Sequence, residues 1–207
     1  MSSLTSSRIT AAVERALDDR QREATEEVER ILAAAVRVIE RVAPEPPRVS
    51  DIVAEAGSSN KAFYRYFAGK DELILAVMER GVGIVVSYLQ HQMAKESKPQ
   101  DKIARWIEGT LAQVADPHLI SKSRAAAEQM SAGVNWLTAD QEMLRPLRDL
   151  LIAPVTELGG RDVDRDVEAV FCCTAATLRR YVHAAGRLGS DDITHVVGFC
   201  LRGLGVS

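Results

Sequence analysis

The sequence has 207 residues and a formal net charge of −3, and 46% of its residues are hydrophobic and 27% are charged. This length fits one large or two small domains, and the apolar content suffices for a core, which excludes a disordered chain. The lack of overall basicity excludes a histone-like DNA binder, although a local basic patch on an acidic body is still allowed.

Cysteine usage points to a reducing compartment, and hydropathy gives no sign of a membrane helix. Cys172, Cys173 and Cys200 are odd in number and lack metal-ligand spacing, which argues against a disulfide framework. No stretch approaches the roughly 20 apolar residues of a membrane helix, and no signal-peptide core follows the start. No local catalytic grouping or phosphate loop is visible. We therefore expect a cytoplasmic protein that is not an enzyme, with no metal and no cofactor.

Strand signals are scarce and the 3.6-residue period recurs throughout, which predicts an all-α fold. Residues 1–21 form an N-terminal extension, either a short extra helix or an arm. The next helix has an apolar stripe from Val28 to Val42 and ends at the prolines of residues 44–47, because proline lacks the amide donor and clashes with the preceding turn.

Two short helices and a long one follow. The first spans about 50–56 and stops at Gly57, since glycine readily takes the left-handed conformation of a helix end. Ser58 and Ser59 can cap the second, about 60–67. The long helix starts near Asp71 and runs toward Ala94. Five further helices are expected, and Pro146 and Pro154 should kink or split the third of them. Their ranges are 101–115, 119–132, 137–158, 163–187 and 191–204.

Two short helices joined by a glycine turn and propped against a longer helix predict a helix-turn-helix, whose second helix enters the major groove of DNA. Residues 57–70 contain Lys61, Arg65 and Lys70 and no acidic residue, a charge of +3 suited to phosphates. Phe63 and Phe67 are expected to face inward. An ordinary surface hairpin of helices is the alternative interpretation.

Residues 28–80 also resemble the tetracycline-repressor (TetR) family of regulators. The shared residues lie at 31–35, 51–52, 56–57, 63–67 and 69–73. The resemblance implies base or phosphate contacts from the second short helix, a phosphate contact at the start of the long helix, and a small capping residue before the second short helix. The predicted DNA-contact residues are Arg48, Ser59, Asn60, Lys61, Tyr64, Arg65, Tyr66 and Lys70.

The chain departs from the family pattern at several positions. Ala62 stands where the family usually has a threonine or serine donor, and Arg48 stands where a capping threonine is usual. Asn60-Lys61 replaces a more common basic-glycine pair. These departures leave the fold expectation intact and leave the operator sequence open.

Large apolar side chains are spread over the C-terminal helices. They form either a filled core or the wall of an apolar ligand cavity, since pockets between bundled helices have such linings. The family resemblance implies a cavity. The predicted pocket residues are Tyr88, Trp106, Met130, Trp136, Met143 and Phe171.

The last two predicted helices each carry an apolar stripe. The resemblance implies that both meet their symmetry mates in a four-helix bundle, which would present two heads to a pseudo-palindrome. Burial inside the monomer would account for only one of the stripes. The predicted interface residues are Val167, Val170, Thr174, Leu178, Tyr181, Ile193, Val197, Cys200, Leu201 and Leu204.

Together these observations predict a homodimeric transcriptional regulator, a repressor released from palindromic double-stranded DNA by a small apolar or amphipathic effector. Residues 22–70 would form the DNA-binding head, and residues 71–207 the ligand-binding and dimerisation domain. Two alternatives remain open. One is a DNA-binding protein without an inducer. The other is a helical carrier or enzyme that shares only the hairpin.

Overall fold

The computed structural model describes residues 3–43, 45–115, 136–183 and 188–206. All regular secondary structure in these ranges is helical, as the sequence predicts. The chain divides into two compact units, Met1–Leu73 and Ile74–Ser207. Among the described helices, none has both the length and the apolar character needed to cross a membrane.

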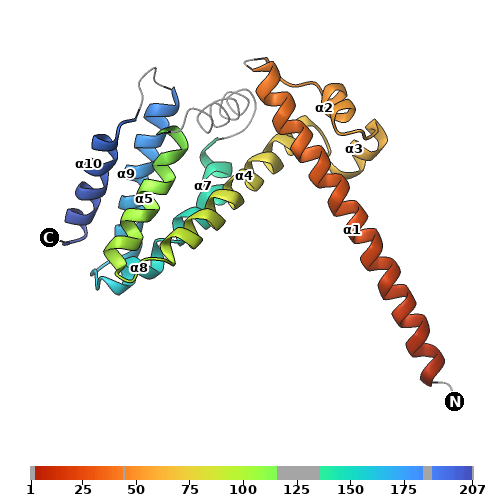
Figure 1. Ribbon diagram of the computed structural model, residues 1–207, viewed down its shortest axis with the longest axis horizontal. Helices are drawn as coiled ribbons and strands as arrows, with labels where there is room; N and C mark the ends of the chain where they lie inside the picture. The colour runs from red at the N-terminus through yellow and green to blue at the C-terminus, as the bar shows by residue number, and fades with distance from the viewer. Residues whose placement is uncertain (1–2, 44, 116–135, 184–187, 207) are drawn as a thin grey trace. The chain divides into compact units, whose positions relative to one another are not determined.

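The first unit is built on one long helix, α1 (Ser3–Val42). The extension at residues 1–21 is therefore neither a separate short helix nor an irregular arm where it is described, because the helix runs unbroken from Ser3. Two short helices, α2 (Val49–Glu55) and α3 (Asn60–Tyr66), lie beside the C-terminal half of α1 (Figure 1). The helix α4 (Lys70–Met93) begins in this unit and continues into the residues of the second.

The core of the first unit comes from the apolar face of α1 and the inner faces of the two short helices. Each of these side chains is less than 9% exposed. Because the face of α1 repeats with the helical period, it can bury one stripe along its length. The core residues are Ile31, Leu32, Ala35, Val38, Ile39, Ile52, Val53, Phe63 and Phe67.

The second unit centres on α5 (Pro99–Ala115), which packs against α8 (Ile152–Glu157), α9 (Val163–His183) and α10 (Ser190–Gly203). The helix α7 (Trp136–Asp149) contacts α9. The predicted helix at 119–132 lies outside the described residues.

The predicted helix at 137–158 is split into α7 and α8, and the two prolines explain where. Pro146 is accommodated inside α7. The chain leaves the helix at Leu150 and Leu151, four and three residues before Pro154. A proline ring clashes with the carbonyl group four residues earlier, so Pro154 breaks the helix at this point.

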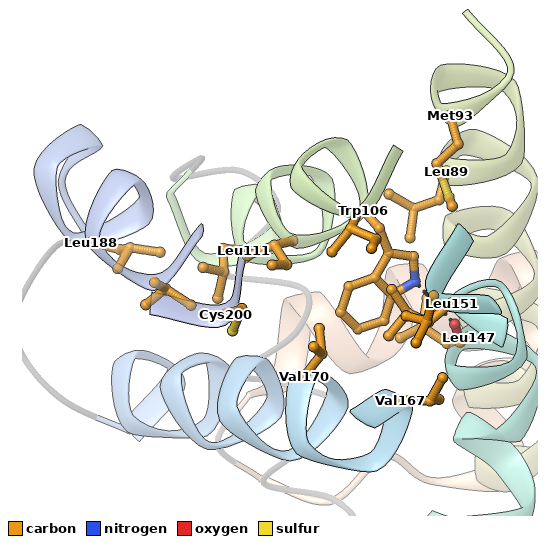
Figure 2. Close-up of a cluster of buried hydrophobic side chains, with 14 residues drawn as sticks. Leu89, Met93, Trp106, Leu111, Leu147, Leu151, Val167, Val170, Leu188 and Cys200 are labelled. Carbon is orange, nitrogen blue, oxygen red and sulfur yellow. Dashed lines mark hydrogen bonds between the residues drawn. The ribbon is translucent and has the colours of Figure 1, made fainter. Parts of the chain in front are cut away.

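Trp106 is the largest side chain in the core of the second unit (Figure 2). Its ring is fully buried, and its Nε1–H donates a hydrogen bond of 3.0 Å to the carbonyl oxygen of Leu147. The ring of Phe171 lies 6.3 Å away, centroid to centroid. Trp106 therefore joins α5 to α7 and α9 through both packing and a hydrogen bond.

Candidate nucleic-acid interface

The turn between α2 and α3 has the geometry that the sequence predicts at Gly57. Gly57 adopts a positive φ of 61°, a conformation that costs a side-chain-bearing residue about 1–2 kcal/mol. The amide of Ser58 donates to the carbonyl of Val53 at 3.0 Å, and the amide of Gly57 donates to that of Ala54 at 3.2 Å. This pair of bonds is the Schellman motif, which ends α2 sharply and turns the chain into α3.

The start of α3 is fixed by a side-chain cap. Ser59 has extended backbone angles, and its hydroxyl oxygen accepts a hydrogen bond of 3.1 Å from the amide of Ala62. A capping serine satisfies one of the amides that a helix start leaves without a partner. The hydroxyl of Ser59 thus serves the helix itself, as the sequence predicts for a cap.

The helix α3 has an inner and an outer face. Ala62 and Phe63 are buried, and the Phe63 ring packs at 5.7 Å from that of Phe67. Tyr64 is 59% exposed and meets the edge of the Phe63 ring at 5.1 Å. The side chains on the outer face are Asn60, Lys61, Tyr64 and Arg65, and all four are exposed.

This arrangement can present donors and positive charge to an anionic polymer. Lysine and arginine neutralise phosphates, and amide and hydroxyl groups can reach base edges or phosphate oxygens. Four of the eight predicted DNA-contact residues therefore share one exposed face of a short helix.

Tyr66 differs from the other predicted contacts because its hydroxyl has an internal partner. It donates a hydrogen bond of 2.9 Å to Oε2 of Glu27 on α1, and the hydroxyl of Ser58 donates to Oε1 of the same carboxyl group at 3.1 Å. Both hydroxyls are partly buried. Glu27 thus ties the turn and the end of α3 to α1. Glu27 was not predicted from the sequence, since a lone glutamate on a helix of mixed charge gives no local signal.

Replacing Tyr66 with phenylalanine should lower the stability of the first unit by about 1 kcal/mol, the typical net contribution of one hydrogen bond. The ring and its packing are retained, so only the bond to Glu27 is lost. Urea unfolding followed by circular dichroism measures the change, and Tyr64→Phe is the control because the Tyr64 hydroxyl is exposed. Unchanged stability together with weakened DNA binding would assign the Tyr66 hydroxyl to DNA instead.

An ion-pair cluster adds a second tie between α1 and α2. Nε of Arg37 lies 2.8 Å from Oε1 of Glu55, and Nη1 of Arg41 lies 2.9 Å from Oε2. The hydrogen bonds from Arg37 and Arg41 lower the pKa of Glu55 below its usual value. Because both arginine side chains are more than half exposed and the Glu55 side chain is partly exposed, salt screens this cluster. The cluster orients α2 on α1. It also pairs the charges of Arg37 and Arg41 with Glu55.

The two remaining predicted DNA contacts lie at helix starts. Arg48 precedes α2, is exposed and makes no side-chain capping bond. Lys70 begins α4, is half-buried and is followed by Asp71 and Glu72. The carboxyl group of Glu72 accepts a hydrogen bond from the amide of Ala68. Acidic residues stabilise a helix start, but here they also reduce the positive potential around Lys70.

The predicted pocket residues do not share one environment. Trp106 is fully buried and hydrogen-bonded, and Phe171 and Met143 are half-buried. Tyr88 is 48% exposed. Met130 and the side chain of Trp136 lie outside the described residues. Trp106 and Phe171 pack together in the core of the second unit. That the predicted residues line a ligand cavity stays a hypothesis.

The predicted dimer residues also divide into two groups. Val167, Val170, Thr174 and Cys200 are 5% exposed or less within their own unit, because they face the core around α5. These four face the interior of their own unit and offer little surface to a second copy, and their assignment to an interface stays a prediction. The others are half-buried at the margin of this core: Leu178, Tyr181, Ile193, Val197, Leu201 and Leu204.

One large apolar side chain on the last helix was missed. Phe199 of α10 is 59% exposed, and Gly198 and Gly203 lie near it in the sequence. On α9, the outward residues Ala169, Cys172 and Ala176 are exposed and small. The sequence did contain a signal for this residue, because Phe199 is a large apolar residue that lies outside the α10 stripe assigned to the interface.

Cys172 and Cys200 lack the environment of a reactive cysteine. A hydrogen bond of 3.1 Å to Glu168 raises the pKa of Cys172. Burial, with Cys173 alongside, raises the pKa of Cys200 to about 12. A raised pKa keeps a thiol protonated and weakly nucleophilic at neutral pH.

The fold and the geometry of α2, the Gly57 turn and α3 define a helix-turn-helix head on a helical body. Residues 31–77 match the family model described as "Bacterial regulatory proteins, tetR family". An uncharacterised HTH-type transcriptional regulator of Bacillus subtilis, YvdT, is 43% identical over 51 residues, which is 25% of this chain and 26% of that protein. The sequence match thus spans about a quarter of the curated relative.

Solved structures extend the likeness to most of the chain. The regulator FadR from Bacillus subtilis, in complex with stearoyl-CoA, superimposes with a TM-score of 0.64 and 21% identity, covering 85% of this chain and 96% of that one. RolR, in complex with resorcinol, gives a TM-score of 0.67 and 17% identity, covering 90% and 91%. At these identities the solved structures share the fold of this chain, and the sequence match to the family model covers residues 31–77.

Proposed function

We propose that this protein is a sequence-specific DNA-binding transcriptional regulator, a homodimeric repressor that a small-molecule effector releases from a palindromic operator. One observation carries the proposal. The helix α3 buries Ala62 and Phe63 and turns Asn60, Lys61 and Tyr64 to the outside. A helix so anchored can enter a major groove without unfolding its own core.

The head would comprise about residues 22–70, and residues 71–207 would bind the effector and dimerise. A two-fold dimer matches the symmetry of a palindromic site. We assign the dimer contact to the outward face of α9, which carries Ala169, Cys172 and Ala176, and to that of α10, which carries Phe199. These faces replace the four buried residues that the sequence suggested.

Release would follow from a population shift. An effector that binds better to one arrangement of the two heads weakens DNA binding by its difference in affinity for the two states. The helix α4 starts beside the head at Lys70 and continues into the second unit, so it can transmit the change. Stearoyl-CoA and resorcinol, bound by the related structures, support an apolar or amphipathic effector here.

Footprinting on the DNA that flanks the protein's own coding sequence tests the proposal, since many regulators of this kind act on neighbouring genes. We expect protection of an inverted repeat. A chain that protects no segment and binds no flanking duplex at low ionic strength would contradict the proposal. Once a site is known, a metabolite screen by thermal shift identifies the effector as a compound that raises Tm and releases DNA.

Lys61→Ala should weaken binding to this site by about 1–3 kcal/mol if the lysine reaches a base, and should lower the salt slope by about 1 if it neutralises a phosphate. The measurement is a titration of labelled duplex at several salt concentrations. Lys98→Ala is the matched control, because Lys98 is exposed in the second unit. Equal affinities and slopes for both variants and the native chain would remove Lys61 from the interface.

A further inference from the structure

Two of the three cysteines lie where α9 and α10 pack against each other. Cys200 of α10 is 5% exposed and belongs to the buried core of the second unit. Cys173 of α9 is partly buried and packs against the same core. The two helices contact each other directly. Figure 2 shows the Cys200 sulfur pointing toward α9, the helix that carries Val170.

The two thiol groups are neighbours across this contact. Burial raises the pKa of Cys200, and the Cys173 thiol raises it further through its charge and a hydrogen bond. Packed helices lie about 8–10 Å apart, axis to axis, with their Cα atoms about 2.3 Å from each axis. Residues that face each other across such a contact therefore fall within the Cα separation of up to about 6.8 Å that a disulfide spans.

Cys172 is next to Cys173 in the chain but does not share its surroundings. Successive residues of an α-helix point about 100° apart, and Cys172 is exposed. Its thiol donates a hydrogen bond of 3.1 Å to Glu168 on the same helix. The packing of the second unit therefore brings Cys173 to Cys200 and turns Cys172 away from both.

We propose that Cys173 and Cys200 form a redox site, in which a hydroperoxide oxidises Cys173 and Cys200 then closes an intrachain disulfide between α9 and α10. Cys173 reacts first because oxidation follows the exposure of the thiol, and Cys200 is buried. In reducing compartments, disulfides that form are usually transient and serve redox sensing.

The chemistry balances with hydrogen peroxide as the oxidant. In the first step, the Cys173 sulfur attacks one peroxide oxygen, an S–O bond forms, the O–O bond breaks, and the other oxygen leaves as water with the thiol proton. In the second step, the Cys200 sulfur attacks the sulfenic sulfur of Cys173. An S–S bond forms, the S–O bond breaks, and the hydroxyl group leaves as water with the Cys200 proton. Two thiols are oxidised and one peroxide is reduced to two waters.

The burial of Cys200 suits the second step. A protonated thiol is a weak nucleophile, so Cys200 does not react with oxidants from solution. A fixed neighbour compensates for low reactivity, because holding two reacting groups together replaces a bimolecular encounter. The disulfide would fix α10 to α9, the two helices to which we assign the dimer contact. The inference goes beyond the proposed regulator and does not rest on DNA binding.

Peptide mapping of the full chain tests the site. The protein is treated with hydrogen peroxide, its remaining thiols are blocked with N-ethylmaleimide, and it is digested with trypsin without reduction. Cleavage after arginine yields peptide 166–179, which holds Cys172 and Cys173, and peptide 188–202, which holds Cys200. We expect these two peptides joined, with the intact protein still a monomer on a non-reducing gel. Free thiols should fall from three per chain to one, and dithiothreitol should restore them.

Cys172→Ala is the matched control for Cys173→Ala, because it removes the adjacent thiol from the same helix. The link should survive in Cys172→Ala and be lost in Cys173→Ala, with circular dichroism checking that both variants fold. Fragment ions of the joined peptides assign the bond to Cys173 in the native chain independently of either variant. This set of results supports the proposal.

Four results overturn the proposal. They are the absence of a link in the native chain, a link to Cys200 that persists in Cys173→Ala, a bond between Cys172 and Cys173 within one peptide, and disulfide-joined dimers in place of monomers. A chain that forms the expected link but protects no DNA supports the redox site and contradicts the proposed function. A chain that protects DNA but forms no link does the reverse.

Discussion

Trp106→Ala should lower the free energy of unfolding of the second unit by about 3–5 kcal/mol, the range for removing a large aromatic side chain from a core. The Trp106 ring is fully buried and packs against Phe171. Truncation leaves a cavity between α5 and its neighbours and removes the hydrogen bond from Nε1–H of Trp106 to the Leu147 carbonyl oxygen. Both effects lower the free energy of unfolding of the second unit.

Trp106→Phe separates the two contributions, because it keeps an aromatic ring and removes the Nε1–H donor. We expect an intermediate loss, about 1–3 kcal/mol for an unsatisfied buried acceptor together with the lost ring volume. Urea unfolding followed by circular dichroism measures both variants, with Ile152→Ala as the exposed control. Native-like stability of Trp106→Ala would show that the ring borders an open cavity, as the pocket hypothesis supposes, and not a filled core.

The boundaries of the helices were the most predictable part of the fold. The prolines of residues 44–47 and the glycine at 57 act locally, through a missing amide or an accessible backbone conformation. The predicted cap at Ser59 is likewise a contact between neighbours in the sequence. Local chemistry of this kind can be inferred without knowing the tertiary structure.

The tie from Glu27 to Ser58 and Tyr66 was not predictable in the same way. Ser58 and Tyr66 lie 31 and 39 residues after Glu27 in the sequence. Whether these side chains meet depends on how α1 packs on the turn between α2 and α3. A tyrosine in an exposed helix can point to DNA or to the head with equal local propensity. The angle at which α1 packs on α3 decides between these two orientations, and no local sequence pattern specifies that angle.

The dimer residues show a different limit. An apolar stripe predicts that a helix face is buried, but burial inside a subunit and burial between subunits use the same residue types. Val167, Val170 and Thr174 face the core of their own unit. The exposed Phe199 carries more information about an interface, because a large apolar side chain off the main stripe has no partner in the core to explain it.

Substitution of the neighbouring residues Phe63 and Tyr64 should affect stability very differently, because their side chains point to opposite faces of α3. Phe63→Ala should cost about 3–5 kcal/mol of stability in the head, since the ring is fully buried and packs on Phe67. The head would then lose its DNA affinity because α3 is no longer held. Tyr64→Phe keeps the ring contact with Phe63 and should leave stability within about 0.5 kcal/mol.

If the Tyr64 hydroxyl contacts DNA, Tyr64→Phe should weaken operator binding several-fold at unchanged stability, whereas Phe63→Ala should lose stability and binding together. Unfolding in urea and duplex titration on the same preparations give both quantities. The contrast is sharp because one residue separates a core position from a surface one. A stable Phe63→Ala variant with native DNA affinity would mean that α3 is not anchored through its inner face, and the orientation of the outer face would then have no physical basis.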